Sequence, residues 1–171
     1  MTLDKFTIKA QEAIQQAVSI AQQSGQQSIE PVHLLKGITA KSKDITNFLF
    51  RKLGVNVNHI ELLLEQEIQH LPRVQGGEPY LSNESNRVLQ EAVNISQKLG
   101  DEFVSIEPVL LALLTIGSTA SRIMKDAGIS EKDMRAAIAE LRQGQKVQSQ
   151  SADENYQSLD KKAKNLVEQA R

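Results

Sequence analysis

The chain has 171 residues, of which 40% are apolar and 24% charged, and its 20 Lys and Arg nearly balance 21 Asp and Glu. This composition is typical of a globular protein long enough to bury a core without a metal or disulfide. The net charge of −1 argues against nucleic acid and acidic membrane surfaces as partners. No apolar run approaches the roughly 20 residues that cross a membrane. The absence of cysteine excludes disulfide scaffolds, thiolate-bound metals and thiol catalysis, and we expect a cytoplasmic protein.

The first part of the chain has the periodicity of an amphipathic helix. Over residues 6–21, apolar side chains recur every three or four positions. Gly25 predicts the end of this helix, because glycine accepts the left-handed conformation common there. Pro31 predicts the start of a second helix, since the first turn does not use the N–H that proline lacks. We expect a third helix over about 45–53, ending at Gly54, and then a fourth.

The same plan returns about 75 residues later. Ile29-Glu30-Pro31-Val32 recurs as Ile106-Glu107-Pro108-Val109, which indicates an internal repeat. The predicted helix ends fall at matching glycines in the two copies: Gly25, Gly54, Gly100 and Gly128. The sequence therefore predicts an all-α domain over 1–142, built from two four-helix units at about 6–68 and 81–142. Two such units, related by a pseudo-twofold axis, can bury a shared face and leave a groove between them.

The connecting segments differ in composition from the repeats. Residues 69–80 contain two prolines and a glycine pair, and are expected to link the units. Residues 143–155 are rich in glutamine and serine, and are expected to form a flexible linker. Residues 156–171 are amphipathic again. An isolated helix of that length is marginal in water, so we expect it either to pack on a partner or to open a further domain.

The segments that resemble a known family are spread over the whole chain: Leu3-Asp4-Lys5-Phe6-Thr7, Ile29-Glu30-Pro31-Val32-His33-Leu34-Leu35, Leu71-Pro72-Arg73-Val74 and Gly100-Asp101-Glu102-Phe103. Together with the repeat, they resemble the Clp repeat N-terminal domain of ClpB-type AAA+ disaggregases. Residues 156–171 resemble the start of that family's first nucleotide-binding domain. The resemblance implies a double Clp repeat fold.

The resemblance also implies a function. ClpB-type proteins are ATP-driven homohexameric rings that thread unfolded or aggregated polypeptides through a pore and work with DnaK-type chaperones. Their N-domain is a mobile substrate-binding module. ATP and magnesium belong to the parent protein, and we expect no cofactor in this fragment. The alternative within the same fold is an adaptor-docking N-domain, as in the protease-linked ClpA and ClpC types. An alternative of another class is a small enzyme.

Motifs for enzyme chemistry are missing from the sequence. A P-loop requires a glycine followed by lysine, and no glycine here is followed by lysine. We therefore expect these 171 residues not to hydrolyse ATP and not to form a catalytic site. None of the three histidines has a second histidine four residues away, so no metal site is expected. His33 is interpreted as a packed or hydrogen-bonded helix residue.

Three polar residues match family positions associated with substrate handling: Thr7, Asp101 and Glu107. Each also has a structural interpretation. Thr7 can be a hydroxyl on a helix surface, and Asp101 a loop residue after a helix end. The carboxylate of Glu107 can satisfy N–H groups at a helix N-terminus, where the helix dipole favours negative charge.

The first helix of the second unit is apolar over more than one face, which is wider than a helix covered on one side needs. The residues expected to line an inter-repeat groove are Val88, Leu89, Ala92, Val93 and Ile95. The alternative is that the other repeat simply buries both faces. A shallow groove of this kind would bind apolar segments weakly and without sequence specificity, at about 25 cal/mol per Å² of buried area.

Overall fold

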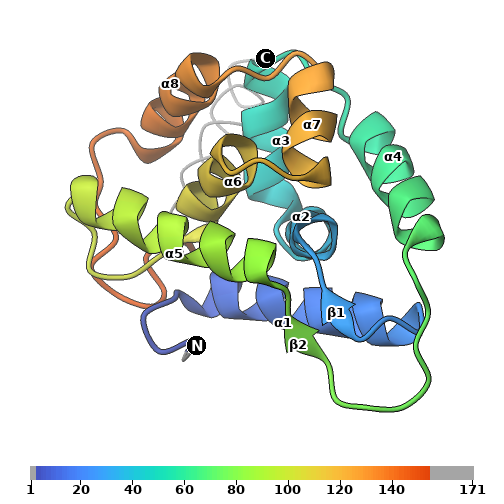
Figure 1. Ribbon diagram of the computed structural model, residues 1–171. Coiled ribbons are helices and arrows are strands. Elements are labelled where there is room, and N and C mark those ends of the chain that lie inside the picture. Colours follow the sequence, from blue (N-terminus) through green and yellow to red (C-terminus); the bar gives the residue numbers. More distant parts are fainter. Residues whose placement is uncertain (1–2, 155–171) are drawn as a thin grey trace, which may run out of the picture.

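The computed structural model describes residues 3–154, which form eight helices in two sets of four (Figure 1). The first set is α1 (Ile8–Gln23), α2 (Pro31–Lys41), α3 (Lys43–Lys52) and α4 (Val57–His70). The second set is α5 (Asn83–Lys98), α6 (Ile106–Thr115), α7 (Thr119–Asp126) and α8 (Glu131–Arg142). The predicted all-α duplicated fold is confirmed. The predicted helix over 156–171 lies outside the described residues.

The second helix of each set lies at the centre of the molecule. In α6, the nine residues from Ile106 to Leu114 are all buried, and α2 is buried over most of its length. The core is aliphatic, as the scarcity of aromatic residues predicts. Gly37 lies where α2 crosses α1, so closely that a β-carbon there would meet the backbone carbonyl of Ala13. No single helix within 3–154 is long and apolar enough to cross a membrane, and α6 with α7 reaches that composition only as a pair bent by 92°.

Two short backbone pairings join the sets crosswise. β1 (Ser28–Ile29), which precedes α2, pairs in parallel with β2 (Tyr80–Leu81), which precedes α5. An isolated bridge joins Phe6, just before α1, to Val104, just before α6. Each set therefore pairs the segment that leads into its first helix with the segment before the second helix of the other set. Pairs of two residues have no sequence periodicity, and the sequence did not predict them.

Residues 143–154, which we call the strap, differ from the flexible linker that their composition predicts. Figure 1 shows the chain after α8 returning toward the N-terminal end of α1. The backbone N–H groups of Ile8 and Glu102 donate to carbonyls of the strap, both at 2.8 Å. Val147 and Asp153 are fully buried. Hydrogen bonds to backbone carbonyls of the strap and burial of its Val147 and Asp153 side chains hold it in place. A composition rich in glutamine and serine predicts neither.

Candidate functional site

An apolar pocket lies where the C-terminal end of α5 meets the start of α6 and the C-terminal half of α8. It has a volume of about 100 Å³. We call it the α5–α6–α8 pocket, and its walls are Ile95, Leu99, Pro108, Leu111, Arg135, Ile138, Ala139 and Arg142. Six of these eight side chains are apolar. The pocket can take an aliphatic side chain, and its lining offers no nucleophile or acid–base pair.

The predicted groove residues on α5 prove to be mostly core. Val88, Leu89 and Ala92 are 0% exposed, so these side chains line no open groove, and that part of the expectation is wrong. Val93 is half-buried against the core. Ile95 does line the α5–α6–α8 pocket. The broad apolar surface of α5 reflects burial between the two sets of helices, the alternative interpretation given above.

The residues that sequence reasoning missed lie at helix ends. Leu99 follows α5, and Pro108 lies in the first turn of α6, so the short turn between these helices brings both side chains to the pocket. Ile138 and Ala139 approach from α8. The sequence did contain a signal for these positions, because Gly100 and Pro108 mark the turn where one helix ends and the next begins.

Thr7 is the N-cap of α1 and is buried, not a hydroxyl on a helix surface. Its Oγ1 accepts a hydrogen bond from the backbone N–H of Ala10 at 3.2 Å. Ser82, which lies 75 residues further along, caps α5 in the same way by accepting from Ser85 at 3.0 Å. Capping of this kind stabilises a helix by about 1 kcal/mol. Thr7 differs from Ser82 in also donating to the Asp153 carboxylate at 2.7 Å.

Asp101 and Glu107 are joined by a residue that the sequence did not single out, Arg142 at the end of α8. Arg142 Nη1 lies 3.0 Å from Asp101 Oδ1 and 2.8 Å from Oδ2. Its Nε donates to Glu107 Oε2 at 2.9 Å, and its Nη2 donates to the Ser105 hydroxyl at 3.0 Å. All of these side chains are buried. The cluster ties α6, α8 and the turn before α6 together.

The cluster also holds the strap. Asp101 Oδ1 accepts from the backbone N–H of Val147 at 3.0 Å. Asp153 lies near enough to feel the charge of Glu107. Burial, chiefly, raises the pKa of Asp153 from 3.8 to about 6, and the negative charge of Glu107 adds to this. The three polar residues expected to handle substrate are thus brought together, but they contact the strap and Arg142 in the interior.

The first set of helices has a neutral counterpart of this cluster. His33 is fully buried, as the structural interpretation predicts. Its Nδ1 accepts from the backbone N–H of Glu30 at 2.8 Å, which leaves Nε2 to donate to Gln26 Oε1 at 2.6 Å. The Gln26 amide in turn donates to the carbonyl of Ile68 at the end of α4. Burial lowers the pKa of His33 to about 4, so the ring is neutral at pH 7.

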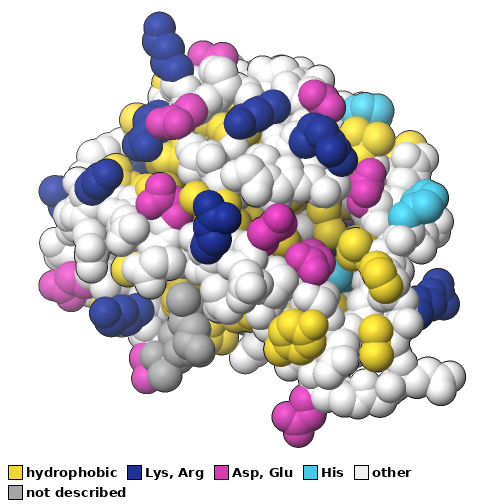
Figure 2. Space-filling view, in the orientation of Figure 1, with side chains coloured by type: hydrophobic (Ala, Val, Ile, Leu, Met, Phe, Trp, Pro, Cys, Tyr) yellow, Lys and Arg dark blue, Asp and Glu magenta, His cyan; other side chains and the backbone are white. Residues whose placement is uncertain are grey.

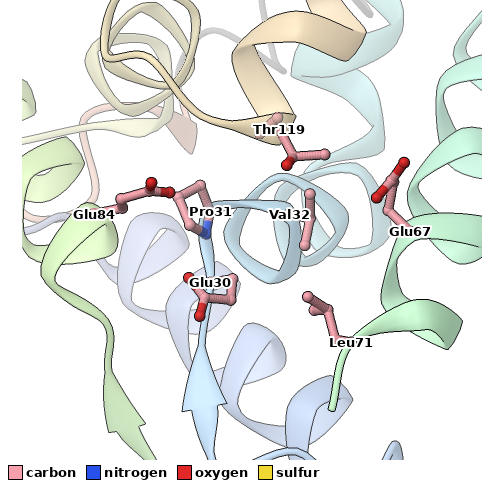
Figure 3. A pocket seen from close by; sticks show the side chains of 8 residues that line it. Glu30, Pro31, Val32, Glu67, Leu71, Glu84 and Thr119 are labelled. Carbon is pink, nitrogen blue, oxygen red and sulfur yellow. The ribbon is translucent and has the colours of Figure 1, made fainter.

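A second pocket, of about 70 Å³, lies between the start of α2 and the end of α4 (Figure 3). Pro31, Val32 and Leu71 contribute apolar walls. Figure 3 shows Glu30, Glu67 and Glu84 around them. Figure 2 shows acidic side chains beside apolar ones near the centre of this face. The two pockets therefore differ in their charged lining: the arginines at the first are paired with carboxylates, and glutamates line the second.

Among residues 3–154, no three His, Asp or Glu side chains are grouped so that they could hold a metal ion.

Comparisons with known proteins agree with this architecture. A family model for the Clp repeat (R) N-terminal domain matches residues 5–127. The chaperone protein ClpB of Bacteroides thetaiotaomicron is 56% identical over 171 residues, which is all of this chain and 20% of the relative. ClpB of Porphyromonas gingivalis is 47% identical with the same coverage. The chain thus spans about a fifth of the length of these curated relatives.

Solved structures show the same fold. The Hsp104 N-terminal domain from Candida albicans superposes with a TM-score of 0.77 at 26% identity, covering 88% of this chain and 99% of that one. A ClpV N-domain in complex with a VipB peptide has a TM-score of 0.65 at 20% identity, with 80% and 86% covered. The family model matches most of the chain, and the duplicated helices agree with it, so the chain belongs to the Clp repeat N-terminal domain family.

Proposed function

We propose that this chain is the substrate-binding N-terminal module of a ClpB-type chaperone, and that it captures exposed apolar segments of unfolded or aggregated proteins in the α5–α6–α8 pocket. The observation that carries the proposal is the pocket itself. Among its apolar walls, Leu99 is half-buried and Ala139 is exposed, so part of the lining is reachable from outside, while Val88, Leu89 and Ala92 beside it are sealed in the core. An apolar hollow of this kind is a typical binding site on a folded domain.

The pocket is suited to weak and unselective binding. Burying one leucine or isoleucine side chain contributes about 1.5–3 kcal/mol, and ordering the bound segment offsets part of it. The mouth offers few polar groups that could read a sequence, because the Arg135 guanidinium is already paired with Glu131 at 2.9 Å. A module that must release its cargo benefits from such weakness.

The longer protein would supply the remaining steps. In the proposal, six copies on a ring raise the effective concentration of pockets around one aggregate, so that weak contacts act together. ATP and magnesium would bind to segments outside this chain, and the ring would work in the cytoplasm with DnaK-type chaperones and pass the captured segment to its pore. The ClpV N-domain bound to a VipB peptide shows that a domain of this fold can hold a peptide.

Filling the pocket tests the proposal. Ala139 is exposed on α8 and lines the pocket, so Ala139→Trp places an indole in the cavity without replacing a core residue. Ala136 is exposed on the same helix but does not line this pocket, so Ala136→Trp is the matched control. Binding of a permanently unfolded polypeptide, carboxymethylated lactalbumin, would be followed by chemical shift titration, with native lactalbumin as the folded comparison.

We expect wild type and Ala136→Trp to bind the unfolded form alone, with shifts around Ile95 and Leu99, and Ala139→Trp to weaken binding at least tenfold. Equal binding by both tryptophan variants would contradict the assignment of the pocket. Absence of binding to either form, together with capture of a folded adaptor, would instead favour the adaptor-docking function.

A further inference from the structure

Within the cluster that holds the strap, three buried carboxylate oxygens have no hydrogen-bond partner among residues 3–154: Asp101 Oδ2, Glu107 Oε1 and Asp153 Oδ1. Asp101 Oδ2 forms an ion pair with Arg142 Nη1 at 2.8 Å, which leaves Glu107 Oε1 and Asp153 Oδ1. The second oxygen of each group is engaged. Glu107 Oε2 accepts from Arg142 and from Ser105, and Asp153 Oδ2 accepts from Thr7. An unsatisfied buried acceptor is costly, and a buried charge without a partner is more so.

Among residues 3–154, the balance of charge in the cluster leaves the Asp153 carboxylate without an ion pair. The Arg142 guanidinium contacts both Asp101 and Glu107, so two acids already share one buried cation. Asp153 is the third acid. The Thr7 hydroxyl contacts it, and the charges of Lys9 at the start of α1 and of Glu107 on α6 act on it from a distance. Lys9 is partly exposed, so solvent screens its charge.

We propose that Asp153 takes up a proton when the strap docks, which neutralises a buried carboxylate that contacts no cation among residues 3–154 and fastens the strap to the helices. The proton comes from solvent. In this state Asp153 receives a hydrogen bond from Thr7 through Oδ2. The role of Thr7 is then to position the strap, which is distinct from contacting cargo in the α5–α6–α8 pocket.

The arrangement makes docking of the strap depend on pH. Burial raises the pKa of Asp153 from 3.8 to about 6, so the docked state binds the proton more tightly than the undocked state. Docking is therefore strongest at low pH, weakens as pH rises from about 4 to 6, and changes no further above that range. From these two values, the docking equilibrium constant should be about tenfold smaller at pH 7.5 than at pH 5.

Undocking would also change the length of the tether. When the strap leaves the body, residues 143–154 become a free polar chain rich in glutamine and serine, which extends the reach of the domain from whatever follows it. A chaperone module would then be held closer to the segment that follows it at acidic pH, and would reach further from that segment at neutral pH.

Hydrogen exchange on the 171-residue chain measures this directly. The reporters are three amides whose bonds depend on the strap: Ile8 N–H to Gln150, Glu102 N–H and Val147 N–H. After correction for the intrinsic pH dependence of exchange, we expect protection about tenfold higher at pH 5 than at pH 7.5 for these amides, and no such change inside α6.

Two variants separate protonation of Asp153 from other titrations. Asp153→Asn carries a neutral amide that can still accept from Thr7, so its strap should stay docked at both pH values. Glu102→Gln removes an exposed carboxylate beside the strap and should keep the wild-type pH dependence. The carboxyl ¹³C signal of Asp153 should report a protonation near pH 6. Unchanged protection with pH in wild type, persistent pH dependence in Asp153→Asn, or an Asp153 signal that titrates near 4 would each overturn the proposal.

Discussion

Replacing Arg142 by methionine should cost the domain a large share of its stability. The change removes a guanidinium that contacts two carboxylates, Asp101 and Glu107, whose side chains are both 0% exposed. Breaking a buried ion pair by removing one partner costs about 3–5 kcal/mol, because the remaining charge stays buried. Urea unfolding followed by far-ultraviolet circular dichroism measures the loss. In a thermal scan, the same loss should lower the Tm of the chain by about 10 °C.

The matched control is Arg135→Met on the same helix. Arg135 is 51% exposed and pairs with Glu131 one turn away, so its loss should cost less than about 0.5 kcal/mol. A triple variant, Arg142→Met with Asp101→Asn and Glu107→Gln, removes the uncompensated charge and should regain a good part of the loss. If Arg142→Met falls within 1 kcal/mol of Arg135→Met, the cluster is not what holds α8 to α6.

Three further expectations concern the interior. Gly37→Ala should destabilise the chain by about 1–3 kcal/mol, because its β-carbon has no room against the α1 backbone, whereas Gly117→Ala, with open space around it, should be close to neutral in the same urea assay. Burial lowers the pKa of His33 to about 4, so the neutral ring stabilises the fold fully above pH 6.5, and this stabilisation is lost as pH falls toward 4. Between pH 7 and 5, the free energy of unfolding should fall by about 2 kcal/mol more in wild type than in His33→Gln, measured in parallel urea melts. Thr7→Ala and Ser82→Ala each remove a helix cap worth about 1 kcal/mol, but Thr7→Ala alone should also raise hydrogen exchange in the strap.

The helices could be predicted from the sequence because their signals are local. Gly25 and Gly100 adopt positive φ angles of 71° and 80° at the predicted helix ends. Pro31 begins α2, as its missing N–H predicts. The repeat then supplied the second set of helices from the first, without any knowledge of how the two sets pack.

The binding surfaces could not be predicted, because they depend on which faces meet. Val88 and Ile95 lie on the same helix with similar side chains, yet one is sealed in the core and the other lines a pocket. The sequence places both residues on an apolar face of the helix, but only the packing against α6 and α8 decides which one is buried and which one lines the pocket. The strap is a harder case, since Val147 and Asp153 bury themselves at positions with no periodic pattern. Arg142 gave no sign of its role, because its partners lie 35 and 41 residues away.

The crosswise backbone pairing has a consequence for the origin of this fold. A single set of four helices, cut from the chain, would expose two unpaired edges, one at each of its short strand segments. A second copy, turned by a twofold rotation, would satisfy both edges at once, since every contact in such an interface occurs twice. The present chain thus corresponds to a symmetric dimer of half-length subunits fused through residues 71–79. Fusion replaces a concentration-dependent association by an intramolecular one, and it frees the two halves to diverge, one to an ionic cluster around Arg142 and the other to a neutral one around His33.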